Sequence, residues 1–492
     1  MAGLDSIDHV ILLMLENRSF DHLLGYLYPK SGNFDGLDGT ESNRDLAGTA
    51  VAVHPVTPEM QNAYYYPLAN PSEGFIATNE QLFGSATAPA DGKATNDGFV
   101  TSFARELGHP AHPLDPKLVG AQTSSIMGMY KPETLPVLSG LAKGFAVCDR
   151  WFASVPTQTF PNRAFAVAGT SLGYIDNSAR DTPAFNTPSV FGKLAEAGQT
   201  WAIYGYSKRP LTANDFPDTV HPGPGCKVES GFDKFQSDAA SGQLAAFSYI
   251  EPEWAHYHDK HNFQIENDQH PVSNLAVGEK LIYDVYTALR SNPAVWEKSL
   301  LIITYDEHGG NYDHLPPETG ATPPDNFTKG PEYFDFTRFG VRIPAVIVSP
   351  LIPPGTIFRG PTGGPPYDHT SIIATLRARF KLGPLGKRDA VAPHLGPVLT
   401  LSVPRHDDPL KGVTSPVAAD PVLQAGSTPI GAAPSAFLEA KAIAAAKLPV
   451  PSAPIENPEQ TVAALPTAAK QYAFIQDRLA AWEAAGKPLT NA

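Results

Sequence analysis

The hydrophobic residues of this 492-residue chain gather into short continuous runs instead of alternating with polar residues. Runs of this kind are typical of strands that are buried on both faces of a parallel sheet. Six of them predict strands, over residues 10–15, 145–148, 201–206, 246–250, 300–305 and 345–348. Together they predict a mostly parallel central sheet.

Helical patterns lie between these runs. Leu281, Val285 and Leu289 recur at the spacing of one helix face. Residues 189–198 begin with a serine suited to a helix N-cap and end with a glycine suited to a helix C-terminus. Alternating strands and helices indicate the α/β fold class, in which helices flank the sheet.

The length of the chain exceeds the roughly 250–300 residues at which a single hydrophobic core usually stops growing. We therefore expect a catalytic domain over residues 1–404 and additional material. Two stretches rich in Gly, Pro, Asn and Asp, near 34–120 and 207–277, are too long for simple connections and predict loop-like insertions.

Beyond residue 404 the composition shifts toward Pro and Ala. Two helices are expected there, over residues 436–447 and 468–485, on either side of a Pro-rich segment. Residues 405–492 are therefore predicted to form a C-terminal extension of the catalytic domain.

The net charge of −14 disfavours nucleic acid and anionic membranes as partners, so a phosphate-bearing substrate needs a local positive centre such as a metal ion. No apolar run reaches the roughly 20 residues of a transmembrane helix, and the N-terminus lacks the pattern of a secretory signal. We expect a soluble protein. Its compartment, cytoplasmic or secreted with a leader removed, and its oligomeric state stay open.

Polar residues cluster where two of the apolar runs end. Glu16 and Asn17 follow the first run, and Asp306 and Glu307 follow the fifth. Ligands of open α/β sheets bind beyond the carboxyl ends of the strands, so the two clusters are expected to converge. Three carboxylates and an amide in one place repel each other unless a cation lies between them. The sequence therefore predicts a site for a divalent metal ion.

The ligand types favour a hard cation such as Mg, Ca or Mn, because oxygen atoms dominate and no cysteine lies nearby. Zn also accepts carboxylates and histidine, so the identity of the metal stays open. Taken separately, each cluster fits equally well the start of a helix or of a loop. Only the pair favours a metal.

A third element surrounds Thr159. Pro161 suits the first position of a helix, which puts Thr159 just ahead of a helix N-terminus, where free N–H groups favour an anion. A threonine hydroxyl is a weak nucleophile unless a base or a metal activates it, and the acidic clusters would hold that metal. In isolation a threonine at this position is more often a helix-capping residue than a nucleophile.

Five motifs occur in order between about Asp8 and Phe380. They are ENRSFDH at 16–22, TFPNR at 159–163, DQHP at 268–271, TYDEHGG at 304–310 with YDH at 312–314, and YDHTS at 367–371. In this set and order they resemble the motifs of the bacterial phosphoesterase family that contains non-specific phospholipase C enzymes and AcpA-type acid phosphatases.

The resemblance implies an alkaline-phosphatase-like α/β core and hydrolysis of phosphate esters through a covalent phosphothreonine. It also implies roles for individual residues: Glu16, Asn17, Asp306 and Glu307 as metal ligands, Thr159 as nucleophile and further ligand, and His270 and His308 as groups that bind phosphate or serve the leaving group.

One departure bears on the substrate. The acid phosphatase pattern has a further active-site histidine between the first motif and the nucleophile, whereas residues 95–99 contain none, and His109 and His112 have no spacing that ties them to the site. We therefore expect phospholipase C-type hydrolysis of phosphodiesters, with a phospholipid as possible substrate. The alternatives are an acid phosphatase acting on monoesters and a non-catalytic metal- or phosphate-binding protein, against which Thr159 counts.

Several further residues have two interpretations. His256, His258 and His261 fit a second metal site or a solvated loop, and the aromatic residues 64–66 with Phe75 fit a choline cage or packing under a loop. Glu251 either reaches the site or caps a turn. Structural roles behind the site are expected for His22, Asp313, His314, Asp368 and His369.

Overall fold

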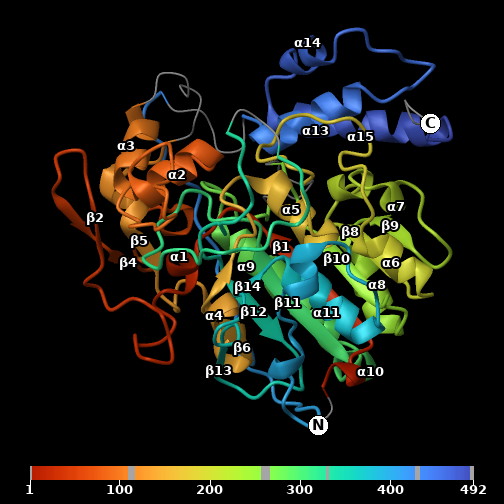
Figure 1. Cartoon of the computed structure of the whole chain (residues 1–492), viewed down its shortest axis with the longest axis horizontal. Coiled ribbons are helices and arrows are strands. Elements are labelled where there is room, and N and C mark those ends of the chain that lie inside the picture. The colour runs from red at the N-terminus through yellow and green to blue at the C-terminus, as the bar shows by residue number, and fades with distance from the viewer. Residues whose placement is uncertain (1–2, 109–116, 256–265, 329–331, 427–432, 488–492) are drawn as a thin grey trace.

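The computed structural model describes residues 3–108, 117–255, 266–328, 332–426 and 433–487. Its centre is an eight-stranded sheet with the order β13-β6-β12-β11-β1-β10-β8-β9 (Figure 1). The strands are β1 (His9–Leu15), β6 (Ala146–Cys148), β8 (Trp201–Gly205), β9 (Lys227–Ser230), β10 (Phe247–Glu251), β11 (Ser299–Tyr305), β12 (Ala345–Val348) and β13 (Thr356–Phe358).

All six strands predicted from apolar runs are present, with bounds that agree within one residue. The sheet is mostly parallel, as expected, and β12 alone among these strands runs antiparallel to its two neighbours. β1 and β11 pair in parallel in the middle of the sheet, with Leu15 opposite Tyr305. The residues that follow these two strands therefore emerge side by side at one edge.

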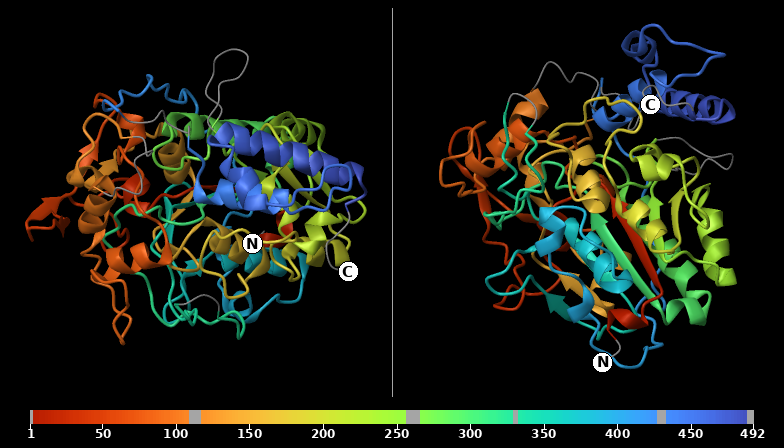
Figure 2. Two further views of the ribbon diagram at one scale, coloured as in Figure 1. Left: turned by 90° about the horizontal axis from the view of Figure 1, so that it is seen from above. Right: turned by 45° about the vertical axis from the view of Figure 1, so that its right-hand side comes forward.

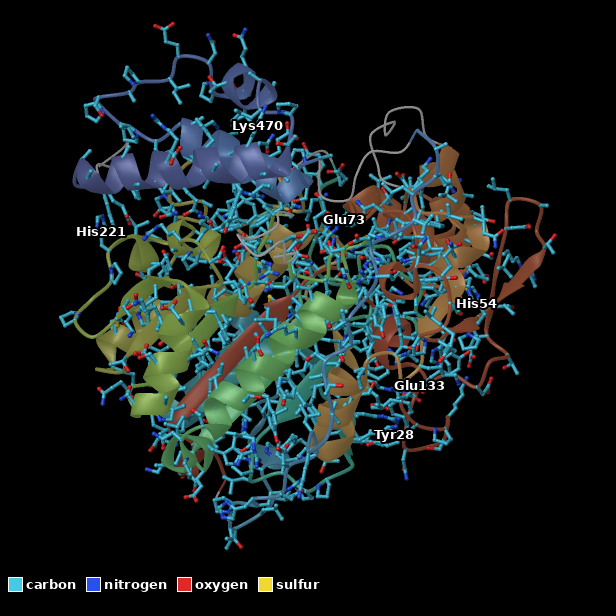
Figure 3. All side chains as sticks on the ribbon, turned by 180° about the vertical axis from the view of Figure 1, so that it is seen from behind. Tyr28, His54, Glu73, Glu133, His221 and Lys470 are labelled. Carbon is cyan, nitrogen blue, oxygen red and sulfur yellow. The ribbon has the colours of Figure 1, made fainter. Side chains whose placement is uncertain are left out.

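Helices cover both faces of the sheet. Figure 1 shows α5 (Thr159–Ala168), α6 (Val190–Glu196) and α11 (Thr370–Phe380) in front. The view from behind shows α4 (Pro136–Gly144) and α9 (Leu275–Arg290) over the other face (Figure 3). α6 begins after Ser189, and α9 buries the predicted apolar face. The α/β class is confirmed.

The first insertion is more regular than the sequence predicts. It contains α2 (Phe75–Phe83) and α3 (Phe99–Gly108), together with the short strands β2 (Ser42–Arg44), β3 (Ala50–Ala52) and β4 (His54–Val56). These elements lie beside the sheet, at the left of Figure 1. Leu82, Phe99, Phe103, Met127 and Met129 belong to a second hydrophobic cluster. The loop prediction was wrong here because frequent Gly and Pro concealed short elements that pack on one another.

The second insertion also contains regular structure. α7 (Pro217–Val220) and α8 (Phe232–Ser241) fold beside the sheet, and β9 extends it as an edge strand. β9 has no fully buried residue, so its sequence lacks the apolar run by which the other strands were found. An edge strand needs only one paired side, and its weak hydrophobicity follows from that position.

The C-terminal residues form α13 (Ala436–Ala446), α14 (Pro458–Ala463) and α15 (Ala468–Ala484). The two expected helices are confirmed, and α14 is additional. The helices lie beyond the carboxyl ends of the strands, above α5 (Figures 1 and 2). The ring of Phe437 on α13 contacts the rings of Phe160 and Trp254, at 5.3 and 4.9 Å between centroids. The domain boundary at residue 404 stays a prediction.

Within the described residues, none of the helices combines the length and the apolar character that crossing a membrane requires.

Candidate active site

The two acidic clusters at the ends of β1 and β11 meet. The backbone N–H of Asn17 donates to Oδ1 of Asp306 at 3.0 Å, and the N–H of Glu307 donates to the same oxygen at 2.7 Å. Glu16, Asn17, Asp306 and Glu307 are all buried. Asn17 has a φ of 58°, a left-handed conformation that asparagine tolerates better than most residues. The predicted convergence at the sheet edge is confirmed.

Burial makes the negative charge of this cluster costly. It raises the pKa of Glu16 well above the ordinary value, and the carboxylate of Asp306 raises it further. Burial also raises the pKa of Glu307, with Glu73 and Asp306 adding to the effect. A cation among these carboxylates would reverse both shifts, because an opposite charge stabilises the ionised form.

One cation of the chain already contacts the cluster. Arg163 on α5 places Nε 3.2 Å from Oδ2 of Asp306 and Nη2 3.5 Å from Oε1 of Glu16. Its guanidinium also donates to the hydroxyl of Tyr249 at 2.9 Å and lies over the ring of Trp254. Sequence reasoning gave Arg163 no role, although its spacing of four residues from Thr159 is that of one helix face.

Thr159 is the first residue of α5 and is buried. Pro161 is therefore the third helical residue, and the prediction that it begins the helix was wrong by two positions. The side chain of Asn162 folds back and donates to the carbonyl of Thr157 at 2.8 Å, which fastens the preceding loop. Because Thr159 and Arg163 are one turn apart, Thr159 lies on the helix face that meets the acidic cluster.

The residues at the sheet edge fit a hard divalent cation. Among the described residues, Oδ1 of Asn17 and Oε1 of Glu307 are buried side-chain oxygens without a hydrogen-bond partner. Buried oxygens normally have a partner, so two unpaired ones beside Glu16 and Asp306 fit the binding of a positive group. Carboxylate and amide oxygens are the ligands that Mg, Ca and Mn prefer. Whether Thr159 is a further ligand stays a prediction.

A second acidic group contains Asp21 of the first motif. Ligand atoms of Asp21, Asp313 and His314 lie within 4.8 Å of one another, so they could hold a metal ion. The buried Arg342 occupies this group, with Nη2 at 2.7 Å from Asp21 and 3.1 Å from Asp313. Its charge balances the two carboxylates, which agrees with the structural role expected for Asp313 and His314.

A cavity of about 90 Å³ opens beside Glu16. His270, Asp268 and Trp254 line it, together with Ser435 and other residues of the C-terminal extension. Burial lowers the pKa of His270, but the carboxylates of Glu73 and Asp268 outweigh this effect and raise it to about 9. The raised pKa favours the charged imidazole at neutral pH, which suits the binding of a phosphate group.

His308 lies in a different environment. Its Nε2 is 2.8 Å from Oε1 of Gln81, and its Nδ1 is 3.3 Å from Oε2 of Glu307. Burial lowers the pKa of His308 to about 3, so the imidazole is neutral at neutral pH. Nε2 of His369 is 2.6 Å from the carbonyl oxygen of Asp306. His308 thus contacts a carboxylate of the acidic cluster, and the roles of His308 and His270 in catalysis stay predictions.

Other predicted residues lie away from the cluster. The carboxylate oxygens of Glu251 accept the backbone N–H groups of Leu211 and Thr212, at the start of a 3-10 helix that precedes Glu251 in the chain, so the prediction that it caps the following turn was wrong. Tyr65 and Tyr66 belong to the main hydrophobic core, whereas Phe75 packs on Phe334 in a separate cluster. These aromatic residues do not form one cage. The histidines at 109, 112, 256, 258 and 261 lie outside the described residues.

Comparison with known proteins identifies the family to which the chain is related. A family model described as "Phosphoesterase family" matches residues 7–383. Non-specific phospholipase C5 of Arabidopsis thaliana is 36% identical over 82% of this chain and 76% of its own length. Non-specific phospholipase C1 of the same plant is 37% identical over 78% and 69%. Phospholipase C B of Mycobacterium tuberculosis is 27% identical over 77% and 74%.

Solved structures show weaker similarity. A protein in the alkaline phosphatase superfamily from Vibrio parahaemolyticus is 14% identical, with a TM-score of 0.31 over 56% of this chain and 65% of that one. The phosphonate monoester hydrolase of Agrobacterium radiobacter is 14% identical, with a TM-score of 0.31 over 54% and 72%.

The family relationship expected from the five motifs is confirmed. Its description as bacterial was too narrow, because several of the similar relatives are plant proteins. The matched region includes the residues that converge at the sheet edge and those of α5. The chain therefore belongs to the phosphoesterase family and is a phosphoric ester hydrolase.

Proposed function

We propose that this chain is a metal-dependent, phospholipase C-type phosphodiester hydrolase that acts through a phosphothreonine at Thr159. The observation that carries the proposal is the position of Arg163. It lies one helical turn after Thr159 and pairs with Glu16 and Asp306, which supports a single centre that includes the nucleophile candidate and both acidic clusters. The phospholipase C names of plant and mycobacterial relatives support a diester substrate.

In this proposal Oγ1 of Thr159 forms a bond to phosphorus while the bond to the leaving alcohol breaks. The hydroxyl proton of Thr159 passes to solvent, and the departing alkoxide gains a proton from charged His270. Water then adds its OH to phosphorus and gives its second proton to the departing oxygen of Thr159, while His270 regains a proton from solvent. A divalent cation, when held by the oxygens of Glu16, Asn17, Asp306 and Glu307, supplies positive charge for the phosphoryl oxygens and for the hydroxyl.

The acid phosphatase alternative has weaker support. In the stretch where that activity has a further histidine, Asn96 donates its side-chain N–H to the carbonyl of Asp313 at 2.8 Å. The backbone of Asn96 in turn accepts a hydrogen bond from the side chain of Asn43 at 2.5 Å. This stretch fastens the first insertion to the core and offers no imidazole to a phosphate group.

An activity screen distinguishes the alternatives. The protein is loaded with Mg, Ca, Mn or Zn and assayed on phosphatidylcholine, phosphatidylethanolamine and p-nitrophenyl phosphate at acid and neutral pH. We expect diacylglycerol release to exceed monoester hydrolysis. Thr159→Ala should lower kcat by at least about 10³-fold at unchanged metal content, and Thr159→Ser should retain part of it. Monoester hydrolysis alone supports the acid phosphatase; metal binding without turnover supports the binding protein.

A further inference from the structure

Glu73, which lies outside all five motifs, contacts two parts of the site at once. Its Oε2 accepts a short hydrogen bond from Nδ2 of Asn17 and lies 3.5 Å from Nε2 of His270. The side chain is only 13% exposed. Figure 3 labels Glu73 near the end of the sheet that faces the C-terminal helices. This carboxylate therefore joins the end of β1 to the cavity.

The contact with Asn17 decides the direction of its amide. The amide has one nitrogen, which donates, and one oxygen, which accepts. Because Glu73 accepts from Nδ2, Oδ1 has to point away from Glu73, and in the described part of the chain Oδ1 has no partner. The backbone of Asn17 is held independently by Asp306. Glu73 thus sets which atom of Asn17 a cation would meet.

The contact with His270 favours the charged imidazole. Nε2 faces the carboxylate of Glu73, while Nδ1 lies 2.5 Å from the carbonyl oxygen of Pro271. Both neighbours are hydrogen-bond acceptors, so both ring nitrogens can donate only when the imidazole carries two protons and is charged. The backbone N–H of His270 donates to Oδ1 of Asp268 at 2.9 Å. Carboxylates of Glu16, Asp268 and Glu266 line the same cavity, and the carboxylate of Glu73 lies 3.5 Å from Nε2 of the ring.

The loop that carries Glu73 is fastened from within the first insertion. Nε2 of Gln81 on α2 donates to the carbonyl of Ser72 at 2.7 Å, and the hydroxyl of Thr78 donates to the carbonyl of Glu73 at 3.4 Å. Oε1 of Gln81 contacts His308. The insertion therefore holds the Glu73 carboxylate at a defined position at the sheet edge. Through Gln81, the same insertion also contacts His308, which follows β11.

We propose that Glu73 is a positioning residue of this site: it aims Oδ1 of Asn17 toward the cation position and holds His270 protonated toward the phosphoryl group. The inference rests on the proposed function of the site and adds a residue from the first insertion to it. Since Glu73 acts through Asn17 and His270, its replacement should change two separate properties together.

The test compares Glu73→Met, which removes both the acceptor for Nδ2 of Asn17 and the charge that faces His270, with Glu73→Gln, which keeps an acceptor and removes the charge, with Glu73→Asp and with the control Glu80→Gln. Glu80 lies in the same insertion, where it pairs with Arg105 at the surface at 2.7 Å. Calorimetric titration with Mn²⁺ measures cation affinity. NMR titration of the metal-free protein with pH measures the protonation midpoint of the His270 imidazole, whose signal is assigned by its absence from the variant His270→Gln. Melting curves verify that each variant is folded.

We expect Glu73→Met to weaken Mn²⁺ binding by about 10- to 100-fold and to lower the His270 midpoint by at least about one pH unit. Glu73→Asp should fall between Glu73→Gln and the wild type, and Glu80→Gln should match the wild type. In the activity assay of the Glu73 variants, kcat should fall by a larger factor than KM changes. The alkaline limb of the pH–activity profile should move to lower pH.

Wild-type Mn²⁺ affinity in Glu73→Met, or an unchanged His270 midpoint in that variant, would overturn the shared role, because the proposal requires both to change. Failure of the proposed function appears differently. If the wild type hydrolyses neither diester nor monoester, the hydrolase assignment of the site fails, while the Mn²⁺ and NMR titrations still decide the role of Glu73.

Discussion

Arg163 donates from Nε to Oδ2 of Asp306 across 3.2 Å, and this contact joins the helix that begins at Thr159 to the end of β11. Both side chains are almost completely buried, so solvent screens the pair little. The same guanidinium reaches Glu16 after β1. One arginine thus connects the nucleophile helix with both acidic clusters, and its removal should affect stability and chemistry together.

Replacement of this arginine tests the balance of charge. Arg163→Met should lower the free energy of unfolding of the metal-free protein by about 3–5 kcal/mol, because it leaves buried carboxylates unpaired. A saturating divalent cation should restore part of the loss. Urea denaturation with and without the cation measures both effects. The control Arg105→Met removes an exposed pair with Glu80 and should cost at most about 1 kcal/mol.

Metal removal should abolish activity and lower stability. Chelation takes away the charge that the carboxylates of Glu16 and Glu307 need when ionised, so hydrolysis should fall to background and return when a divalent cation is added. A cation at 100 times its Kd should stabilise the fold by about 2.7 kcal/mol, seen as a rise in Tm. Full activity of a sample shown by elemental analysis to be metal-free would contradict metal dependence.

The His270–Glu73 contact should make stability depend on alkaline pH. The pKa of His270 is raised to about 9, above its ordinary value of 6.5. A raised histidine pKa stabilises the fold fully below about pH 6.5, and this contribution is lost as pH rises through 9. Urea denaturation at pH 6, 7.5 and 9.5 should show a decline that His270→Gln removes. An equally steep decline in the variant would refute this assignment.

The group around Arg342 should behave as a buried ion pair. Asp313→Asn removes one charge from the contact with Arg342 and should destabilise the protein by about 3–5 kcal/mol. The number of divalent cations bound per chain should stay the same, since Arg342 already neutralises Asp21 and Asp313. A loss of one bound cation in the folded variant would instead identify a metal at Asp21, Asp313 and His314.

The C-terminal extension should support the site. Phe437 packs its ring on Phe160, next to Thr159, and on Trp254, which lies under Arg163. Phe437→Ala should lower stability by about 3–5 kcal/mol and reduce kcat, whereas Phe437→Leu should recover most of both. Chemical denaturation and steady-state kinetics measure the two effects. Wild-type kcat in Phe437→Ala would show that the extension contributes packing alone.

Local pattern determined much of the fold. Uninterrupted apolar runs identified six strands, because both faces of a central strand in such a sheet are buried and therefore carry hydrophobic side chains. The positions after β1 and β11 followed from the same pattern, since parallel strands in register end at the same edge. The sequence alone therefore brought Glu16, Asn17, Asp306 and Glu307 together, and its motifs identified the family and the candidate nucleophile Thr159.

Tertiary structure decided what surrounds these residues. The pairing of Arg163 with two strand ends, the contact of Glu73 with Asn17 and His270, and the support from Phe437 all join segments that are distant in the chain. Periodicity describes how a segment buries its own apolar face and carries no information on which loop or helix it meets. Only the folded chain determines these contacts between distant segments, because they depend on how the insertion and the extension pack around the sheet edge.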